Sequence, residues 1–168
     1  MSRSFAPAEF GVRGLIDDVA MALGSRLIES SQELSYGVAG NPEIFADRGR
    51  LAQGIIHAVT HVSEQSSSEA TITLAVRVSS SVFITIANSD ERDEELDPAS
   101  EPIVAELDPS NGSSLGLLIA SSIAEMHDGT LDVQYTGSRG VTITIVLPIH
   151  DPPDTGDAGG DSLGVDAQ

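Results

Sequence analysis

The chain has 168 residues and a formal charge of −18, from 26 acidic residues against 8 basic residues that are all arginine. This charge argues against sequence-independent binding to nucleic acid or to an anionic membrane, and it favours a basic partner over a polyanion. The absence of cysteine excludes a disulfide scaffold and thiolate chemistry. No apolar run approaches the roughly 20 residues that span a bilayer, and no signal sequence opens the chain, so we expect a cytoplasmic protein.

The first half of the chain predicts two helices and three strands. Apolar residues recur every three to four positions over residues 10–28 and again over residues 51–62, which indicates two amphipathic helices. Residues 33–38 alternate polar and apolar, as a half-buried strand does. Residues 71–78 and 82–87 alternate in the same way on either side of three serines, which predicts an antiparallel hairpin.

The second half begins with a long segment that has no periodicity. Residues 90–108 hold nine acidic side chains against Arg92 alone, and a loop of that length within a compact domain is usually functional or mobile. A third helix follows two serines and carries an apolar stripe over residues 115–126. Two alternating segments, 130–135 and 141–147, then predict the last pair of strands.

This order of elements predicts an α/β fold. We expect a two-layer α/β sandwich, in which three helices cover one face of a mixed five-stranded sheet. Three regions follow from the composition: a disordered leader or linker over residues 1–9, one domain over residues 10–149, and an acidic disordered tail over residues 150–168, where Asp, Gly and Pro dominate.

Five short motifs occur in a fixed order, with the expected element between each pair. They are Phe10-Gly11-Val12-Arg13-Gly14-Leu15, Asp47-Arg48-Gly49-Arg50-Leu51-Ala52-Gln53, Gly112-Ser113-Ser114-Leu115-Gly116-Leu117, His127-Asp128-Gly129, and Gly140-Val141-Thr142 with Leu147-Pro148. Together they resemble the catalytic, ATP-binding domain of bacterial histidine kinases, the GHKL or Bergerat-fold ATPase shared with gyrase and MutL-type proteins. The resemblance covers about residues 10–148. It implies the sandwich predicted above, with a Mg-ATP site in the family.

The chain departs from this family in the helix that holds the magnesium ion. His61 stands where the family carries an Asn that helps to hold Mg on the triphosphate, and His57 fills another position that is often Asn. Neutral imidazole prefers softer transition metals, whereas Mg requires hard oxygen ligands. The resemblance therefore implies a site in which Mg coordination is impaired.

A second departure lies where the family binds adenine. The Asp-x-Gly-x-Gly motif of the family reads Asn88-Ser89-Asp90-Glu91-Arg92 here. Asn88 keeps a carbonyl acceptor for adenine, but Asp90 and Arg92 fill space that glycine leaves free. The acidic residues of the following loop would surround the anionic triphosphate, so we expect poor ATP affinity.

Nine positions are thus predicted remnants of a nucleotide site, and none is predicted to be catalytic. They are His57, His61, Asn88, Asp90, Arg92, Gly112, Ser114, Gly116 and Thr142.

Several of these positions allow a second interpretation. His57 and His61 could clamp a transition metal with a third ligand such as Asp90, or they could form a partly exposed polar face of the helix. A phosphoacceptor role is disfavoured, because kinases place that histidine on a dimerisation hairpin that is absent here. Residues 112–117 either bind phosphate at a helix N-terminus or form a turn that the fold needs. Thr142 either lines the adenine pocket or is an ordinary strand residue.

We therefore expect a degenerate kinase lobe, a pseudokinase-like signalling and protein-interaction module with no cofactor beyond weak ATP and Mg binding. The expected partner is a response regulator, a phosphotransfer protein or a partner kinase, without nucleic acid or direct membrane contact. The alternative is the catalytic domain of an active sensor histidine kinase, which would dimerise through helices absent from this chain and phosphorylate a histidine on them. An anti-sigma factor that phosphorylates serine shares the fold, but no residue favours it.

Overall fold

The computed structural model describes residues 5–89, 103–104, 115–136 and 140–150 of the chain. The elements in these residues, in chain order, are β1 (Ala8–Gly11), α1 (Val12–Glu29), β2 (Glu33–Val38), β3 (Glu43–Ala46), α2 (Arg48–Gln65), β4 (Thr71–Val78), β5 (Ser81–Ser89), β6 (Ile103–Val104), α3 (Leu115–Met126), β7 (Thr130–Thr136) and β8 (Gly140–Pro148). None of these helices is long and apolar enough to cross a lipid bilayer.

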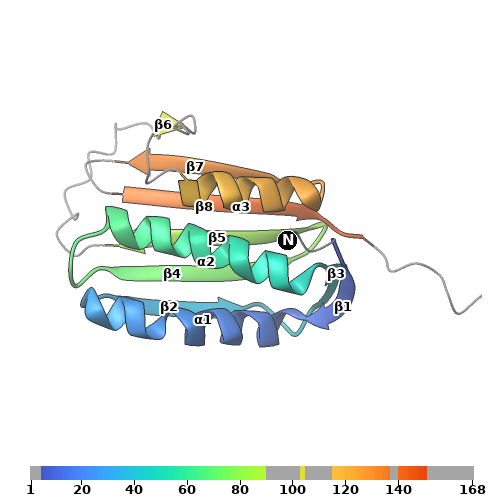
Figure 1. The fold of residues 1–168 in the computed structure, drawn as a ribbon, viewed down its shortest axis with the longest axis horizontal. Helices are drawn as coiled ribbons and strands as arrows, with labels where there is room; N and C mark the ends of the chain where they lie inside the picture. The colour runs from blue at the N-terminus through green and yellow to red at the C-terminus, as the bar shows by residue number, and fades with distance from the viewer. Residues whose placement is uncertain (1–4, 90–102, 105–114, 137–139, 151–168) are drawn as a thin grey trace, which may run out of the picture.

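The predicted two-layer α/β sandwich is confirmed. One mixed sheet runs in the order β2-β4-β5-β8-β7-β6, and the three helices lie on the same face of it (Figure 1). β2 pairs with β4 in parallel, and the next three pairings are antiparallel. The five predicted strands form this sheet, and the two-residue strand β6 extends it beyond β7. β6 lies in a stretch expected to be loop, because two residues are too few to show alternation.

A separate two-stranded ribbon joins the N-terminal segment to the start of α2. β1 pairs with β3 in antiparallel fashion, from Ala8 opposite Ala46 to Gly11 opposite Glu43. The backbone N–H of Ala6 donates to the Asp47 carboxylate at 2.9 Å. These contacts correct part of the predicted disordered leader, since residues 8 and 9 already form a strand. Residues 1–4 and the predicted tail 151–168 lie outside the described residues.

The core lies between the helices and one face of the sheet. Alternate residues of the central strands point into it, because successive side chains of a strand point to opposite faces. The buried members are Ile72, Leu74, Val76, Val82, Ile84, Ile86, Val141, Ile143, Ile145 and Leu147. They pack against the apolar stripes of α1 and α2, which include Leu15, Val19, Ile55 and Val59. The opposite face of the sheet carries the intervening residues, mostly Thr and Ala, and no described helix covers it.

Side chains close both ends of α2. Asp47 is the N-cap, as the sequence predicts, and its carboxylate accepts from the backbone N–H of Arg50 at 3.1 Å. At the other end, the buried amide of Gln32 donates to the carbonyls of Ser63 and Ser67, each at 3.1 Å. The Ser63 hydroxyl donates to the side-chain amide oxygen of Gln32, Oε1, at 2.5 Å. The helix that carries both candidate histidines is therefore fixed at each terminus.

Candidate functional site

Four of the predicted site residues gather where the second half of α2 meets the end of β5 and the start of β8. His57 and His61 come from α2, Asn88 from the end of β5 and Gly116 from the first turn of α3. The described chain is interrupted at this same end of the sheet, after Ser89 and between β7 and β8 (Figure 1). The fold thus brings together residues that the sequence motifs placed in one site.

His61 is buried and bonded inside the protein. Its side chain is only 3% exposed, and its Nε2 lies 3.0 Å from the Tyr135 hydroxyl. The two rings meet edge to face, with centroids 6.4 Å apart and planes at 70°. Burial raises the pKa of Tyr135 above its ordinary value, so the phenol keeps its proton at neutral pH. The interpretation of His61 as part of an exposed polar face is therefore wrong.

Tyr135 is a site residue that the sequence analysis missed. It lies on β7 opposite Val141, so strand pairing carries its ring to the start of β8. The alternation of Leu131, Val133 and Tyr135 was a usable signal, because it places the ring on the face that α2 and α3 cover. The contact of this ring with His61 depends on how the helices pack on the sheet, which the sequence pattern does not show.

Asn88 uses both ends of its amide within the protein. The backbone N–H of Val141 donates to Asn88 Oδ1 at 2.9 Å, and Asn88 Nδ2 donates to Ser66 Oγ at 2.8 Å. The Ser66 hydroxyl in turn donates to the carbonyl of Val62 at 2.6 Å. Asn88 therefore ties β8 to the end of α2, and the acceptor expected to meet adenine already receives one hydrogen bond.

Gly116 lies against His57, where α3 meets α2. A Cβ atom placed on Gly116 would lie 3.5 Å from His57 Nδ1 and 3.6 Å from its carbonyl oxygen, which are ordinary van der Waals distances. Packing against α2 therefore does not require glycine at this position. His57 itself is partly buried, so it lines the contact between the two helices.

Thr142 does not join these residues. It sits on β8 between Val141 and Ile143, both of which are buried in the core on the helical face. Its side chain must point to the opposite, uncovered face of the sheet. The prediction that Thr142 lines the adenine pocket is corrected on this ground, and Val141 is the residue of this motif that faces the helices.

The remaining predicted site residues, Asp90, Arg92, Gly112 and Ser114, lie outside the described residues. Within the part of the chain that is described, no group of three or more His, Cys, Asp or Glu side chains could hold a metal ion. The third ligand proposed for a transition metal, Asp90, is not among the residues searched.

The His127-Asp128-Gly129 motif contains a histidine that holds two helices together. His127 is 3% exposed, its Nε2 accepts from the backbone N–H of Asp47 at 3.0 Å, and its Nδ1 donates to the Ile123 carbonyl at 2.8 Å. Because a backbone N–H must donate, these two contacts define the neutral tautomer with the proton on Nδ1. This histidine therefore connects the end of α3 to the start of α2.

The fold is a two-layer α/β sandwich that brings His57, His61, Asn88 and Gly116 to one end of the sheet, and comparisons with known proteins show which proteins share it. No family model matches the chain. The sensor histidine kinase ZraS of Klebsiella oxytoca is 29% identical over 128 residues, which are 72% of this chain and 27% of that kinase. The autoinducer 2 sensor kinase/phosphatase LuxQ of Vibrio parahaemolyticus is 27% identical over 124 residues, 67% of this chain and 14% of that protein.

Solved structures agree with these relatives. The catalytic domain of histidine kinase ThkA superposes with a TM-score of 0.69 at 21% identity, covering 88% of this chain and 97% of that domain. The Acinetobacter baumannii histidine kinase AdeS gives a TM-score of 0.67 at 16% identity, covering 89% of this chain and 70% of that one. The chain has the fold of a histidine kinase catalytic domain, and the resemblance drawn from its motifs is confirmed. It spans about a quarter or less of the length of the curated kinases that it matches.

Proposed function

We propose that this chain is a degenerate ATP-binding-type domain of a two-component sensor histidine kinase, acting as a signalling and protein-interaction module that binds Mg-ATP weakly or not at all. The observation that carries the proposal is His61, which is buried against Tyr135 at the position where the family has its Mg-holding Asn. An imidazole offers no oxygen to a hard cation. The donor set at this position therefore does not fit Mg.

Two further features support weak nucleotide binding. Asn88 is neutral where the family has a carboxylate, and its carbonyl oxygen is shared with the Val141 N–H, so a hydrogen bond to adenine would be weaker. The chain also carries a charge of −18. Repulsion between like charges several Å apart near a protein surface costs about 1 to 4 kcal/mol per pair, and each 1.4 kcal/mol weakens binding about tenfold.

A nucleotide titration tests the proposal directly. The 168-residue chain is titrated with a fluorescent ATP analogue in the presence of Mg, and binding is followed by anisotropy. We expect no saturation below about millimolar nucleotide. Micromolar binding that depends on Mg would refute the degenerate site.

Restoring the family residues should reverse the defect. The triple change of His61→Asn, Asp90→Gly and Arg92→Gly returns an amide oxygen to the metal position and removes two bulky side chains. We expect at least about a tenfold gain in affinity for the analogue. The matched control is Asp132→Asn, which removes one charge at an exposed position of β7. If the triple variant binds no better than the control, the cleft has diverged beyond these three positions.

The alternative function, an active catalytic domain, is favoured by one observation. Gly116 is retained although packing against α2 does not demand it, which leaves a role at the helix N-terminus for binding phosphate. ShkA, at 21% identity, has been solved in complex with AMPPNP. Fusing dimerisation helices from a kinase to this chain and assaying ATP-dependent phosphohistidine would test it. Labelling that exceeds a His61→Ala control would establish the kinase.

The proposed partner class follows from the same relatives. ThkA has been solved in complex with the response regulator protein TrrA. We propose a response regulator, a phosphotransfer protein or a partner kinase as the protein that this domain holds. Binding that is unaffected by saturating ATP would agree with a module whose output does not depend on nucleotide.

A further inference from the structure

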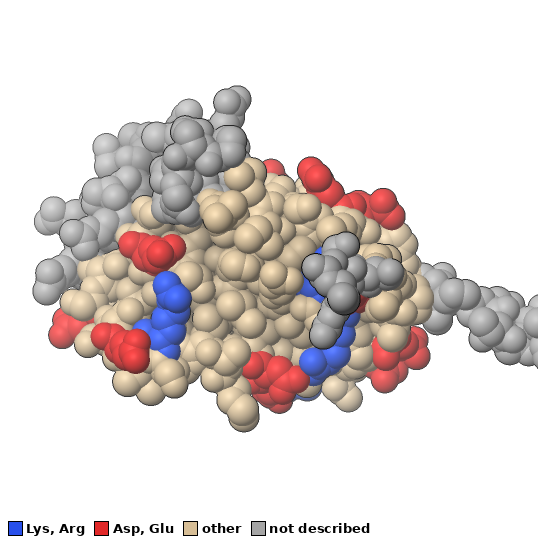
Figure 2. Space-filling model, viewed as in Figure 1, with Lys and Arg blue, Asp and Glu red and all other residues tan. Residues whose placement is uncertain are grey.

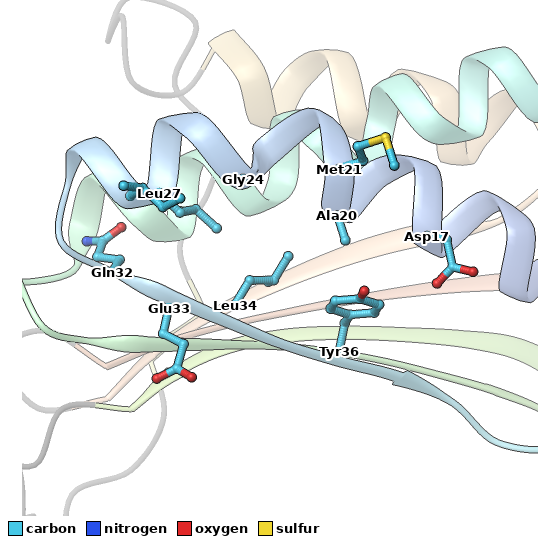
Figure 3. Close-up of a pocket in the computed structure, with 10 residues that line it drawn as sticks. Asp17, Ala20, Met21, Gly24, Leu27, Gln32, Glu33, Leu34 and Tyr36 are labelled. Atoms are coloured by element: carbon cyan, nitrogen blue, oxygen red, sulfur yellow. The ribbon is translucent and has the colours of Figure 1, made fainter.

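A groove of about 630 Å³ runs between α1 and β2, at the edge of the sheet (Figure 3). Leu27, Leu34 and the exposed side chains of Met21, Ile28 and Tyr36 line it. Met21 is 82% exposed, Ile28 75% and Tyr36 48%. Exposed apolar side chains gathered in one groove are typical of sites where proteins interact. It lies at the opposite edge of the sheet from β6 and away from His61.

The strand beside this groove has an open edge. β2 is the first strand of the sheet, and among the described strands it pairs only with β4; at its end, Arg13 donates to the Val38 carbonyl. The backbone N–H of Glu33 donates to the Ala70 carbonyl at 3.1 Å, and that of Ala39 donates to the Val76 carbonyl at 3.0 Å. In a parallel pair alternate residues face the partner strand, so the N–H and C=O groups of Leu34 and Tyr36 point outward. β2 contains neither lysine nor proline, the residues that commonly protect such edges.

The charges around the groove are acidic. Asp17 and Glu33 line it, and Glu29 ends α1 beside it. Figure 2 shows several acidic side chains, with arginines between some of them, along the border of the molecule that α1 and β2 form. No described residue makes a hydrogen bond or ion pair with these three carboxylates. The two arginines of α1 have other partners: Arg13 donates to the carbonyls of Gly40 and Val38, and Arg26 lies 3.9 Å from Glu64.

We propose that an extended, basic segment of a partner protein adds to β2 as a further strand. Its backbone would bond to the outward groups of Leu34 and Tyr36. Apolar side chains at every second position would enter the groove beneath α1, and Lys or Arg at the intervening positions would face Glu33. The inference rests on the proposed role as an interaction module and gives it a surface, but it does not depend on the nucleotide cleft.

A second copy of this chain is the less favourable occupant. Two β2 edges brought together would bring two grooves, each lined by Asp17 and Glu33, into one interface. Each copy also carries a charge of −18. Like charges facing each other across a new strand pair destabilise it, whereas a basic segment neutralises the same carboxylates.

Peptide binding to the full chain tests the proposal. The probe is a fluorescein-labelled peptide of seven residues in which valine and lysine alternate. Two matched peptides carry N-methyl groups on one or the other set of alternate amides, which removes hydrogen-bond donors from one edge without changing charge. We expect the unmodified peptide to bind, one N-methylated peptide to lose about tenfold or more in affinity, and a glutamate-for-lysine peptide not to bind. Equal affinity of both N-methylated peptides and the parent would overturn strand addition.

Variants of the chain locate the site. Tyr36→Pro removes an outward N–H without removing a bond to β4, so it should fold and should weaken the peptide about tenfold or more. Tyr36→Thr keeps the backbone N–H and should lose less peptide affinity than Tyr36→Pro. Glu33→Gln should weaken binding and reduce its dependence on salt, whereas Asp132→Asn, a charge change on β7, should have no effect.

Three outcomes would overturn the proposal. One is unchanged peptide affinity in folded Tyr36→Pro. Another is amide chemical-shift changes, on adding peptide, that fall outside β2 and α1. The third is self-association in sedimentation that Tyr36→Pro abolishes, which would make a second copy the occupant. Should Tyr36→Pro not fold, the N-methylated peptides and the shift map decide on the unaltered chain. The ATP titration is a separate measurement, so failure of this surface and failure of the degenerate cleft are told apart.

Discussion

We expect the contact between His61 and Tyr135 to stabilise the folded protein. The imidazole is buried and its Nε2 is 3.0 Å from the phenol. Tyr135→Phe removes that partner and should lower the free energy of unfolding by about 1 to 2 kcal/mol. Tyr36→Phe is the control, because Tyr36 is 48% exposed and its hydroxyl can bond to water. Equal denaturation midpoints for the two variants would contradict a stabilising role for the pair.

Asp47 makes a prediction about acid stability. Burial of its carboxyl opposes ionisation, but the N–H groups of Ala6 and Arg50 and the charge of Arg50 outweigh that effect and lower its pKa below the ordinary 3.8. A pKa that is lower in the folded state stabilises the protein fully above the unfolded value, and the gain disappears as pH falls through the folded value. The stability difference between the native chain and Asp47→Asn should therefore be constant above about pH 5 and shrink on acidification below 3.8.

Chemical denaturation at a series of pH values measures this effect. The comparison isolates Asp47 because both proteins share every other carboxylate. A difference that grew as the pH fell would mean that the carboxyl is destabilised by folding, and it would contradict the roles assigned to the Ala6 and Arg50 N–H groups.

The connection between α3 and β7 should tolerate only glycine at position 129. A Cβ atom on Gly129 would lie 2.3 Å from the Val146 carbonyl oxygen, a contact that forces the backbone to move. Gly129→Ala should cost about 3 kcal/mol in the free energy of unfolding. Gly116→Ala meets only ordinary contacts and should leave stability unchanged or slightly raised, since alanine favours helices. Thermal unfolding of the two variants is the check, and equal losses would contradict the geometry.

The long elements could be predicted because each has a periodicity of its own. The alternation over residues 71–78 and 141–147 and the stripes of α1 and α2 required no knowledge of the rest of the chain. β1 and β3 were missed because each has only four residues, and Phe10 also fits the apolar spacing of the helix that follows. Short strands are defined by their partner, which lies more than 30 positions away.

The candidate site was predictable only in part, for a related reason. Motif order predicted that His57, His61, Asn88 and Gly116 lie in one region, and the structure places them at one end of the sheet; their role in binding stays a prediction. Thr142 was assigned from a motif alone, although the alternation of Val141, Ile143 and Ile145 already turns its side chain the other way. Tyr135 required the pairing of β7 with β8, which local pattern does not supply.

The whole molecule carries many more acidic than basic residues, so we expect its thermal stability to depend on salt. A net charge of −18 on 168 residues repels itself in the compact state. Raising sodium chloride from low concentration to about 0.5 M shortens the Debye length to a few Å, so the melting temperature should rise. Thermal unfolding is repeated with a non-ionic osmolyte at equal osmolality. This control separates the screening of charge repulsion by salt from the stabilisation that comes from excluding a solute from the protein surface. A melting temperature that fell with salt would show that attractive ion pairs outweigh the repulsion.

Gln32 belongs to two surfaces at once. One side of it borders the groove beneath α1, and its amide holds the last carbonyls of α2 beside Ser66, which in turn anchors Asn88. Turning that single amide would release hydrogen bonds at the end of the helix on which His57 and His61 sit. Gln32 therefore links the groove beneath α1 directly to the C-terminal end of the helix that carries His57 and His61.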